Sequence, residues 1–395
     1  MTGKRPGDDP TWAMVAGGGT AGHVVPGLAV GRALVARGHP ASSIHYVGSE
    51  RGLEAEMVPA AGFGLTLLPG RGFARKVTAR GMADNAGAAW GLSRAVARAT
   101  ALVRRRRPAV VVAVGGYAGV PCGLAAVAAR VPLVVVEQNA VPGSANRLLG
   151  RFARACAVSF PGTDLPRSVV TGNPVRPEIL GIDRSAAGRA AARAALGLPE
   201  GRRVVAVTGG SLGALRINRA VLGAVAQWAE RSDLAVRHAV GARDWDMVQA
   251  EQPALPTGDS GLVYRPVRYE DRMDLLLAAA DLLVCRAGGN TVAEVAVVGL
   301  PAVLVPLPNA PGDHQTANAQ ALVGAGGAVL VPDGELDVDR LEEELAPLVK
   351  DPRRRERMAA AARTVGLPDA AARVADLVEQ AARPSGGERT TGSAS

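Results

Sequence analysis

The chain has 395 residues, of which 48% are hydrophobic and 21% charged; this is enough to bury the cores of two domains and too apolar for global disorder. Aromatic residues make up only 3%, which disfavours a protein that binds single-stranded nucleic acid by stacking its bases. The net charge of +9 is uneven, because residues 1–172 hold 20 Lys and Arg against 8 Asp and Glu, which predicts an anionic partner for that half.

The first residues, Met1–Thr11, are polar and acidic. They lack the apolar stretch of a secretory signal, so we expect no export and a frayed terminus. Cys122, Cys156 and Cys285 lie far apart in the sequence and match neither a disulfide framework nor a zinc site. We therefore expect a cytoplasmic protein without a bound metal.

Apolar runs of strand length alternate with helical stretches through the first half. One stretch, Val110–Ala129, carries no charge over about the length of a membrane span. Gly115, Gly116 and Pro121 interrupt it, so we interpret it as a buried strand, a glycine turn and a packed helix. The predicted strands of this half are Trp12–Ala16, Ile44–Val47, Val110–Val114, Leu133–Val136 and Ala155–Ser159.

The second half repeats this plan after a break at Val170–Arg176, where glycine and proline stop regular structure. Strands that alternate with helices predict a parallel sheet with right-handed crossovers in each half. A helix over Ala370–Ala382 follows a break at Gly366–Pro368, and residues 383–395 are expected to be a disordered tail. The predicted strands are Arg203–Thr208, Ala235–Val240, Gly261–Tyr264, Leu282–Cys285, Ala302–Pro306 and Gly327–Leu330.

Three glycine-rich loops follow predicted strands and open helices, at Gly17–Gly22, Gly115–Gly119 and Gly209–Gly213. Glycine lets a backbone approach a phosphate at a helix N-terminus, although each loop alone is equally explained as a tight turn. Three such loops at the carboxyl ends of strands predict a cleft in which both halves bind phosphates. Ser211 adds a hydroxyl donor that suits a pyrophosphate.

The first loop contains the G-x-G-x-x-G pattern of dinucleotide-binding proteins at Gly17, Gly19 and Gly22. Such a site also needs an acidic residue at the end of the second strand, about 20 positions further on. That strand ends at Ser49 and the next acid, Glu50, arrives late. A nicotinamide-dependent oxidoreductase is therefore a disfavoured alternative.

Three polar side chains near strand ends are candidates for ligand binding or proton transfer. Glu294 falls in the first turns of a helix, where it either binds the hydroxyls of a ribose or complements the helix dipole. Gln315 lies in a polar, proline-rich loop from which it would bond sugar hydroxyls. His23 follows the first glycine loop, and its ordinary pKa of about 6.5 suits proton transfer, with a cap on the helix turn as the alternative.

Seven ordered motifs resemble the MurG family, the UDP-N-acetylglucosamine transferases of peptidoglycan synthesis, over about Val15 to Leu377. The motifs are specific in combination, since a chance match to all seven in order is negligible. They are Gly18–His23, Gly115–Tyr117, Glu137–Asn139, Gly172–Arg176, Gly209–Ser211, Cys285–Glu294 and His314–Asn318.

This resemblance implies a GT-B glycosyltransferase with two doubly wound, Rossmann-like α/β domains that face each other across a cleft. Residues 1–172 would form the acceptor and membrane-facing domain, with a helix over 368–382 packed back on it. Residues 173–367 would bind UDP-N-acetylglucosamine (UDP-GlcNAc). The implied reaction moves GlcNAc with inversion to the C4 hydroxyl of N-acetylmuramic acid (MurNAc) in lipid I. The product, lipid II, serves cell-wall biogenesis and hence cell shape and division.

The resemblance also implies residue roles, with His23 as the catalytic base and no metal or other cofactor. Leu212, Glu270, Ala287 and Asn290 depart from the family's commoner residues near the nucleotide. Residues implied to bind the donor are Thr20, Ala21, Gly22, Asn139, Arg176, Gly210, Ser211, Gly289, Thr291, Glu294 and Gln315. Residues implied to bind the acceptor are His23, Gly116, Tyr117 and Glu137.

The basic first half has an implied partner in an anionic membrane surface. A loop with Phe73, Arg75 and Lys76 is the implied membrane patch of a peripheral protein on the cytoplasmic face of the plasma membrane. The four arginines at 104–107 are interpreted instead as complementing a helix C-terminus. Other proteins of cell-wall synthesis are implied partners as well.

Two further functions remain as alternatives. A related transferase that glycosylates another lipid, such as diacylglycerol, would share much of the pattern, although Tyr117 and Glu137–Asn139 favour lipid I. A non-catalytic nucleic-acid binder is suggested by the basic first half. The scarcity of aromatic residues and the lack of a recognisable binding module oppose it.

Overall fold

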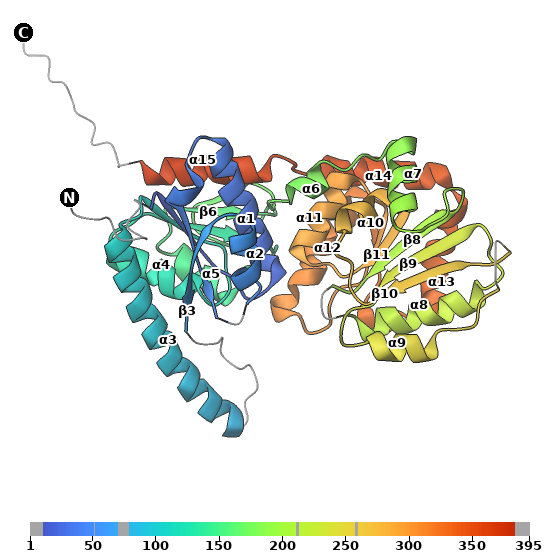
Figure 1. Cartoon of the computed structure of the whole chain (residues 1–395), viewed down its shortest axis with the longest axis horizontal. Helices are drawn as coiled ribbons and strands as arrows, with labels where there is room; N and C mark the ends of the chain where they lie inside the picture. Colours follow the sequence, from blue (N-terminus) through green and yellow to red (C-terminus); the bar gives the residue numbers. More distant parts are fainter. Residues whose placement is uncertain (1–10, 51, 70–78, 211–212, 257–259, 384–395) are drawn as a thin grey trace, which may run out of the picture.

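A computed structural model describes residues 11–50, 52–69, 79–210, 213–256 and 260–383, which form two α/β lobes side by side (Figure 1). Predictions on Phe73, Arg75, Lys76, Ser211 and the terminal segments up to residue 10 and from 384 fall outside these ranges. The first lobe contains strands β1 (Ala13–Ala16), β2 (Ile44–Ser49), β3 (Gly64–Leu68), β4 (Val110–Ala113), β5 (Leu133–Glu137), β6 (Ala155–Val158) and β7 (Ser168–Val170), and helices α1 (Ala21–Ala36), α2 (Glu54–Ala60), α3 (Ala79–Arg106), α4 (Gly119–Ala128) and α5 (Ser144–Gly150).

The second lobe repeats the alternation of strands and helices. Its strands are β8 (Arg203–Thr208), β9 (Leu234–Ala239), β10 (Val263–Val267), β11 (Leu282–Cys285), β12 (Ala302–Leu304) and β13 (Ala328–Leu330). Its helices are α6 (Pro177–Leu180), α7 (Ala186–Ala195), α8 (Leu215–Gln227), α9 (Trp245–Glu251), α10 (Met273–Ala279), α11 (Gly289–Val298), α12 (His314–Ala325), α13 (Val338–Lys350) and α14 (Pro352–Val365).

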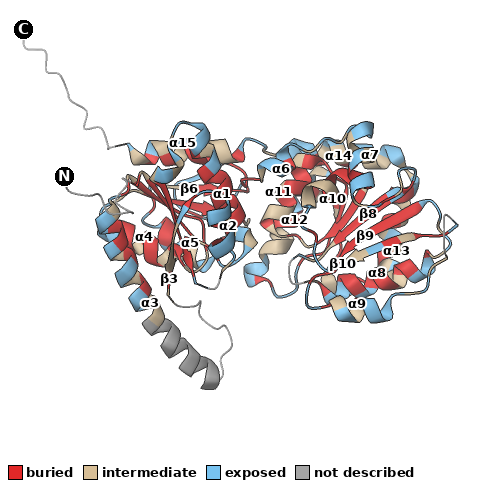
Figure 2. Ribbon diagram, in the orientation of Figure 1, coloured by how far each residue is buried: buried red, intermediate tan, exposed pale blue. Residues whose placement is uncertain are grey.

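Both sheets are parallel and doubly wound. Within the described residues the strand orders are β3-β2-β1-β4-β5-β6-β7 and β10-β9-β8-β11-β12-β13. In each sheet the strand order changes direction next to the first strand, between β1 and β4 and between β8 and β11. At such a switch point the loops after the two neighbouring strands run to opposite faces of the sheet and leave a crevice at its carboxyl edge. Helices cover both faces, so the central strands are buried throughout, as the burial colours show (Figure 2). The fold class predicted from the sequence is confirmed.

The sequence analysis missed two strands, β3 and β7, which lie at the two edges of the first sheet. All three residues of β7 are exposed, and only one residue of β3 is buried. An edge strand has a neighbour on one side only, so its residues need not form a continuous apolar run. The predicted plan of five strands for the first half is therefore incomplete, whereas all six strands of the second half were found.

The uncharged stretch Val110–Ala129 forms β4 and α4, as the sequence predicts. Gly115 and Gly116 turn the chain between them with φ angles of 92° and 76°, which residues with side chains rarely adopt. Across the part of the chain that the structure describes, we find no helix with the length and apolarity needed to cross a membrane.

The last helix, α15 (Ala370–Ala382), leaves the second lobe and packs on the first (Figure 1). It lies against α1 and strands β4 to β6 and buries Val374, Ala375 and Val378 in the core of the first lobe. Nη1 of Arg37, the residue after α1, pairs with Asp376 at 2.6 Å. At the crossing a Cβ atom on Gly172 would lie 2.7 Å from the Cβ of Leu367, so the two connections between the lobes touch.

We expect Val378→Asp to destabilise the first lobe. The side chain is fully buried, and a carboxylate there would have no partner, a change that costs about 3 kcal/mol or more. Thermal unfolding followed by circular dichroism should show a lowered first-lobe transition. Val365→Asp, at a position of α14 that is 38% exposed, is the control. Equal melting of the two variants would contradict the role of α15.

Candidate active site

The first two glycine-rich loops pack against each other through their backbones. A Cβ atom at Gly17 would lie 2.6 Å from the Gly115 carbonyl oxygen, and one at Gly116 would collide with the Gly18 carbonyl. These glycines are therefore required by the close approach of two backbones at the carboxyl edge of β1 and β4. The packing of two loops explains them without a ligand.

The first loop also holds an anion from within the chain. The Gly19 N–H donates to Glu54 Oε2 at 2.8 Å, and the N–H and hydroxyl of Ser49 donate to Oε1 at 2.6 and 2.8 Å. A phosphate at the Gly19 amide would have to displace this carboxylate, which opposes both phosphate binding at the first loop and a nicotinamide site. The sequence analysis missed Glu54. The nearby Gly48 and Gly52 were the available signal, because both leave room for its side chain.

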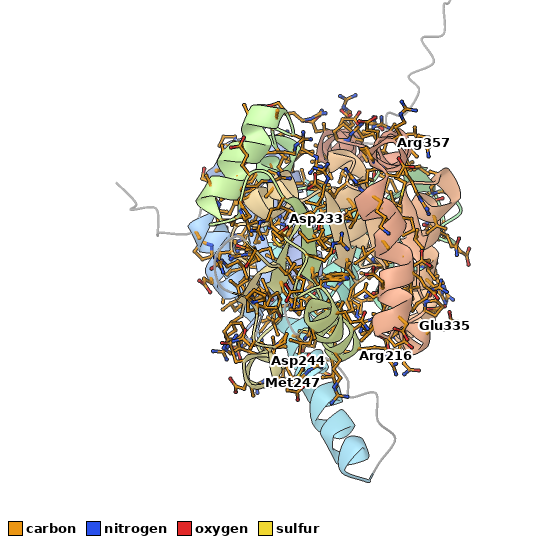
Figure 3. All side chains as sticks on the ribbon, turned by 90° about the vertical axis from the view of Figure 1, so that its right-hand side faces the viewer. Arg216, Asp233, Asp244, Met247, Glu335 and Arg357 are labelled. Atoms are coloured by element: carbon orange, nitrogen blue, oxygen red, sulfur yellow. The ribbon has the colours of Figure 1, made fainter. Side chains whose placement is uncertain are left out.

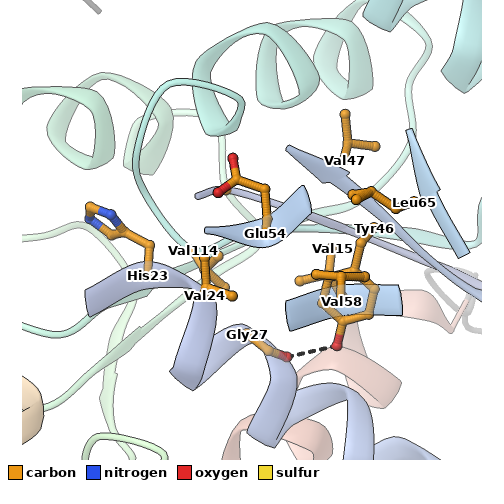
Figure 4. A pocket seen from close by; sticks show the side chains of 11 residues that line it. Val15, His23, Val24, Gly27, Tyr46, Val47, Glu54, Val58, Leu65 and Val114 are labelled. Atoms are coloured by element: carbon orange, nitrogen blue, oxygen red, sulfur yellow. Dashed lines mark hydrogen bonds between the residues drawn. The ribbon is translucent and has the colours of Figure 1, made fainter. Parts of the chain in front are cut away.

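His23 lies on the first turn of α1, where the first loop meets the helix. Its Nδ1 is 3.4 Å from Thr20 Oγ1, and a Cβ atom at Gly115 would come within 2.7 Å of its ring. With Glu54 it lines a cavity of about 10 Å³, room for a single water molecule (Figure 4). Burial lowers the pKa of His23 below its ordinary 6.5, while the charge of Glu137 acts against this. The imidazole is therefore neutral at pH 7 and can accept a proton.

Glu137, an implied acceptor ligand, is buried and fully bonded within its own loop. Its Oε1 accepts from the N–H and the side-chain amide of Asn139 at 3.0 and 3.1 Å. Its Oε2 accepts from Gly143 N–H at 3.0 Å and from Asn146 Nδ2 at 2.8 Å. Both oxygens are thus used to shape the loop after β5, and the structure gives Glu137 the role of holding Asn139 in place.

Asn139 reaches across to the second lobe. Its Oδ1 accepts from Asn318 Nδ2 at 3.1 Å, and the N–H of Ala140 donates to Asn318 Oδ1 at 2.8 Å. Asn318 lies on α12, is fully buried and also donates to the Ala287 carbonyl. A Cβ atom at Gly289 would collide with the Gln138 carbonyl, so this small residue allows the contact. Asn318 ended a sequence motif but was not assigned a role.

A second polar contact joins the first loop to α11. Asn290 Nδ2 donates to the Ala21 carbonyl at 3.3 Å, and its Oδ1 accepts from Asn173 Nδ2 at 2.8 Å. Asn290 is one of the departures from the implied family pattern. It ties the loop before His23 both to the start of α11 and to the crossing between the lobes.

Arg176 and Glu294, predicted separately as donor ligands, pair with each other. Arg176 Nε and Nη2 donate to Glu294 Oε1 at 3.1 and 2.8 Å. Burial raises the pKa of Glu294, and the Arg176 charge opposes this rise. Glu294 lies beyond the first turn of α11, so the explanation as dipole complementation is not needed. Arg176 also lines a cavity of about 400 Å³ between α1 of the first lobe and α6 and α10 of the second.

The remaining predicted ligands lie after the carboxyl ends of strands in one or the other sheet. Gln315 lies on α12 rather than in a loop, and its Oε1 accepts from Leu307 N–H at 2.9 Å. Tyr117 donates its hydroxyl to the Pro69 carbonyl at 3.0 Å, and burial raises its pKa. Gly210 N–H donates to Thr208 Oγ1 at 3.2 Å. Of the other predicted ligands, Gly22 lies at the start of α1 and Gly116 in the second loop. Thr291 lies in the first turn of α11.

Comparisons with known proteins identify the family and the fold. Residues 13–158 match the glycosyltransferase family 28 N-terminal domain, and residues 204–374 match the family 28 C-terminal domain. A UDP-N-acetylglucosamine--N-acetylmuramyl-(pentapeptide) pyrophosphoryl-undecaprenol N-acetylglucosamine transferase of Nocardioides sp. (strain ATCC BAA-499 / JS614) is 45% identical over 365 residues, 92% of this chain and 96% of that protein. Its counterpart of the same name in Clavibacter sepedonicus is 44% identical over 379 residues, 94% and 97% of the two chains.

Among solved structures, the crystal structure of Acinetobacter baumannii MurG is similar over 94% of this chain and all of that one, with a TM-score of 0.71 and 27% identity. Two facing, doubly wound lobes with these relatives define a hexosyltransferase of the GT-B fold. The chain belongs to glycosyltransferase family 28. The resemblance seen in the sequence is confirmed.

We expect Arg176→Ala to destabilise the protein more as pH rises. Without the guanidinium the pKa of buried Glu294 rises further above its unfolded value, so folding binds a proton and stability falls as pH increases from about 5 to 8. At pH 8, where the carboxylate would be buried without its partner, the loss should be about 2 kcal/mol.

Urea unfolding at pH 5 and pH 8 measures this difference. The control is Arg32→Ala, which removes the ion pair between Arg32 of α1 and Glu178, both exposed. The stability of this variant should not change in this way with pH. A loss from Arg176→Ala that is the same at both pH values would contradict the coupling to Glu294.

Proposed function

We propose that this chain transfers GlcNAc from UDP-GlcNAc to the C4 hydroxyl of MurNAc in lipid I and so makes lipid II. One observation carries the proposal: the Ala21 carbonyl accepts a hydrogen bond from Asn290 across the lobes. Ala21 lies two residues before His23 and Asn290 four before Glu294. The candidate base and the candidate nucleotide ligand therefore border the same interlobe space, and the names of the relatives supply the substrates.

In this proposal the donor binds to residues 173–367. Both Arg176 bonds end on Oε1 of Glu294, so the ribose hydroxyls approach Oε2, and the nucleoside occupies the 400 Å³ cavity beside Arg176. The diphosphate binds at Gly210 and Ser211, which precede α8 in the sequence, because the N-terminal amides of a helix favour negative charge. The other donor contacts are Thr20, Ala21, Gly22, Asn139, Gly289, Thr291 and Gln315.

The reaction is a single displacement. The MurNAc O4 attacks the anomeric carbon of GlcNAc as the bond to the UDP oxygen breaks, and the configuration inverts. His23 takes the proton of the attacking hydroxyl, since its neutral form predominates at pH 7. The charge that develops on UDP is stabilised by the amides before α8 and by the helix dipole.

The acceptor binds to residues 1–172. Gly116 and Tyr117 contact it in this proposal, and Glu137 acts by holding Asn139 in its loop rather than by touching the acceptor. A lipid-borne acceptor requires a membrane surface, and we place the protein on the cytoplasmic face of the plasma membrane with the first lobe toward the lipid. Other proteins of cell-wall synthesis are further partners in this view.

An exposed basic and apolar surface on α4, α5 and the turns that follow them supports the membrane contact. Leu148 of α5 is 41% exposed, and Phe152, in the turn after this helix, is 53% exposed. Arg147 and Arg151 are exposed as well. Helix α4 contacts α5. Apolar tips among cations suit an anionic leaflet. We call this set, with exposed Val127 of α4 and exposed Arg130 in the turn after α4, the α4–α5 patch. The membrane role of Phe73, Arg75 and Lys76, which lie outside the described residues, is also proposed.

We expect His23→Ala to lower kcat by about 100-fold or more, because general-base catalysis contributes roughly that factor. The assay is transfer of labelled GlcNAc from UDP-GlcNAc to a lipid I analogue, with UDP-glucose and UDP-GalNAc as control donors. The acid limb of kcat/KM in the wild type should lie below pH 6.5, because burial lowers the pKa of His23, and it should be absent from the residual activity of the variant. Full turnover by folded His23→Ala would remove the assignment.

We expect Arg151→Glu with Phe152→Ser to weaken co-sedimentation with vesicles that contain phosphatidylglycerol by about tenfold, since each surface cation contributes about 1 kcal/mol. Vesicles of phosphatidylcholine alone should bind neither protein well. The control is Arg357→Glu on α14 of the second lobe (Figure 3). Unchanged binding by the double variant would argue against the α4–α5 patch.

A further inference from the structure

Glu54 is the most enclosed charged group in the described part of the first lobe, with 1% of its surface exposed. Its carboxylate accepts three hydrogen bonds, one from Gly19 and two from Ser49. Three glycines, Gly18, Gly48 and Gly52, surround it so closely that a Cβ atom at any of them would collide with the Glu54 side chain. The chain therefore provides a cradle made for one carboxylate.

The same carboxylate is connected to His23 through one peptide segment. The backbone of Gly18 lies close enough to His23 to act on the pKa of its imidazole, and Gly19 donates to Glu54. On its other side Gly18 meets Gly116 of the second loop, where a Cβ atom would collide with the Gly18 carbonyl. The orientation of the Gly18–Gly19 segment, and with it the backbone next to His23, is thus set between Glu54 and the second loop.

We propose that Glu54 is a positioning residue for proton transfer, acting as the built-in anion of the first glycine loop that holds Gly18–Gly19 so that His23 points at the acceptor hydroxyl. The inference rests on the proposed role of His23. Because Glu54 takes the Gly19 amide, it also excludes an external phosphate from this amide, so the diphosphate of a lipid acceptor binds elsewhere.

The test is removal and replacement of the carboxylate. We expect Glu54→Ala to lower kcat for GlcNAc transfer at least tenfold while the KM for UDP-GlcNAc stays within about twofold, because Glu54 bonds to Gly19 and Ser49, whereas the residues proposed to hold the nucleotide lie on the other lobe. Sodium formate at about 100 mM should restore a large part of kcat by filling the emptied cradle. Formamide, which is neutral, and sodium chloride at equal ionic strength should not.

A second readout does not depend on activity. With isotope-labelled histidine, the chain has five imidazoles to assign, and the His23 resonance in Glu54→Ala should move back toward its wild-type position as formate is added. Formate should also raise the melting temperature of this variant and not that of the wild type. Glu56→Ala, which removes an exposed acid two residues further along α2, is the matched control and should behave as the wild type throughout.

The outcomes separate this inference from the base assignment. Wild-type kcat in Glu54→Ala, or a lowered kcat with no response of rate and His23 resonance to formate, overturns the role of Glu54. Full activity of His23→Ala overturns the base assignment, whereas the formate response still reports on the cradle. If Glu54→Ala does not fold, Glu54→Gln fills the cradle without charge. It should lose kcat without response to formate, and wild-type kcat would again overturn the proposal.

Discussion

Three buried glutamates organise the loops between the two lobes, and each obeys the rule that a carboxylate removed from water must be hydrogen-bonded or paired with a cation. Glu54 binds the first glycine loop, and Glu137 binds the loop after β5. Glu294 pairs with Arg176 next to the crossing between the lobes. Each ties a polar segment to a rigid strand or helix, so the segments that would face a substrate are placed before any substrate binds.

Several polar contacts join the described parts of the two lobes, beside apolar contacts such as that of Ala140 with the core of the second lobe. Asn139 meets Asn318, Ala21 meets Asn290, and Arg32 pairs with Glu178 at an exposed position. Replacing an interlobe hydrogen bond by one to water costs little free energy, whereas separating α15 from the first sheet would expose apolar side chains. The structure therefore joins the lobes firmly at the crossing and lightly across the site. This suits an enzyme that must admit a nucleotide sugar on one lobe and a lipid-borne alcohol on the other.

The sequence identified most of the polar residues of the site but not their relations. His23, Arg176 and Glu294 could be selected because each has chemistry suited to transfer and lies near a strand end. The direction in which a side chain points is not specified by spacing along the sequence. For this reason the sequence did not show that Arg176 and Glu294 pair, or that both carboxylate oxygens of Glu137 accept hydrogen bonds within its own loop. Glu54 escaped notice for a related reason, because the search for an acid followed distance along the chain, whereas the loop and the helix α2 meet in space.

The sequence by itself determined the central strands, the glycine turns and the family, because strands buried on both faces must be continuous apolar runs and tight backbone approaches admit only glycine. Only the tertiary structure decided the edge strands β3 and β7 and which partner each buried carboxylate takes. Hydrogen-bond partners 35 residues apart, such as Gly19 and Glu54, are brought together by strand order, and strand order is a property of the whole sheet.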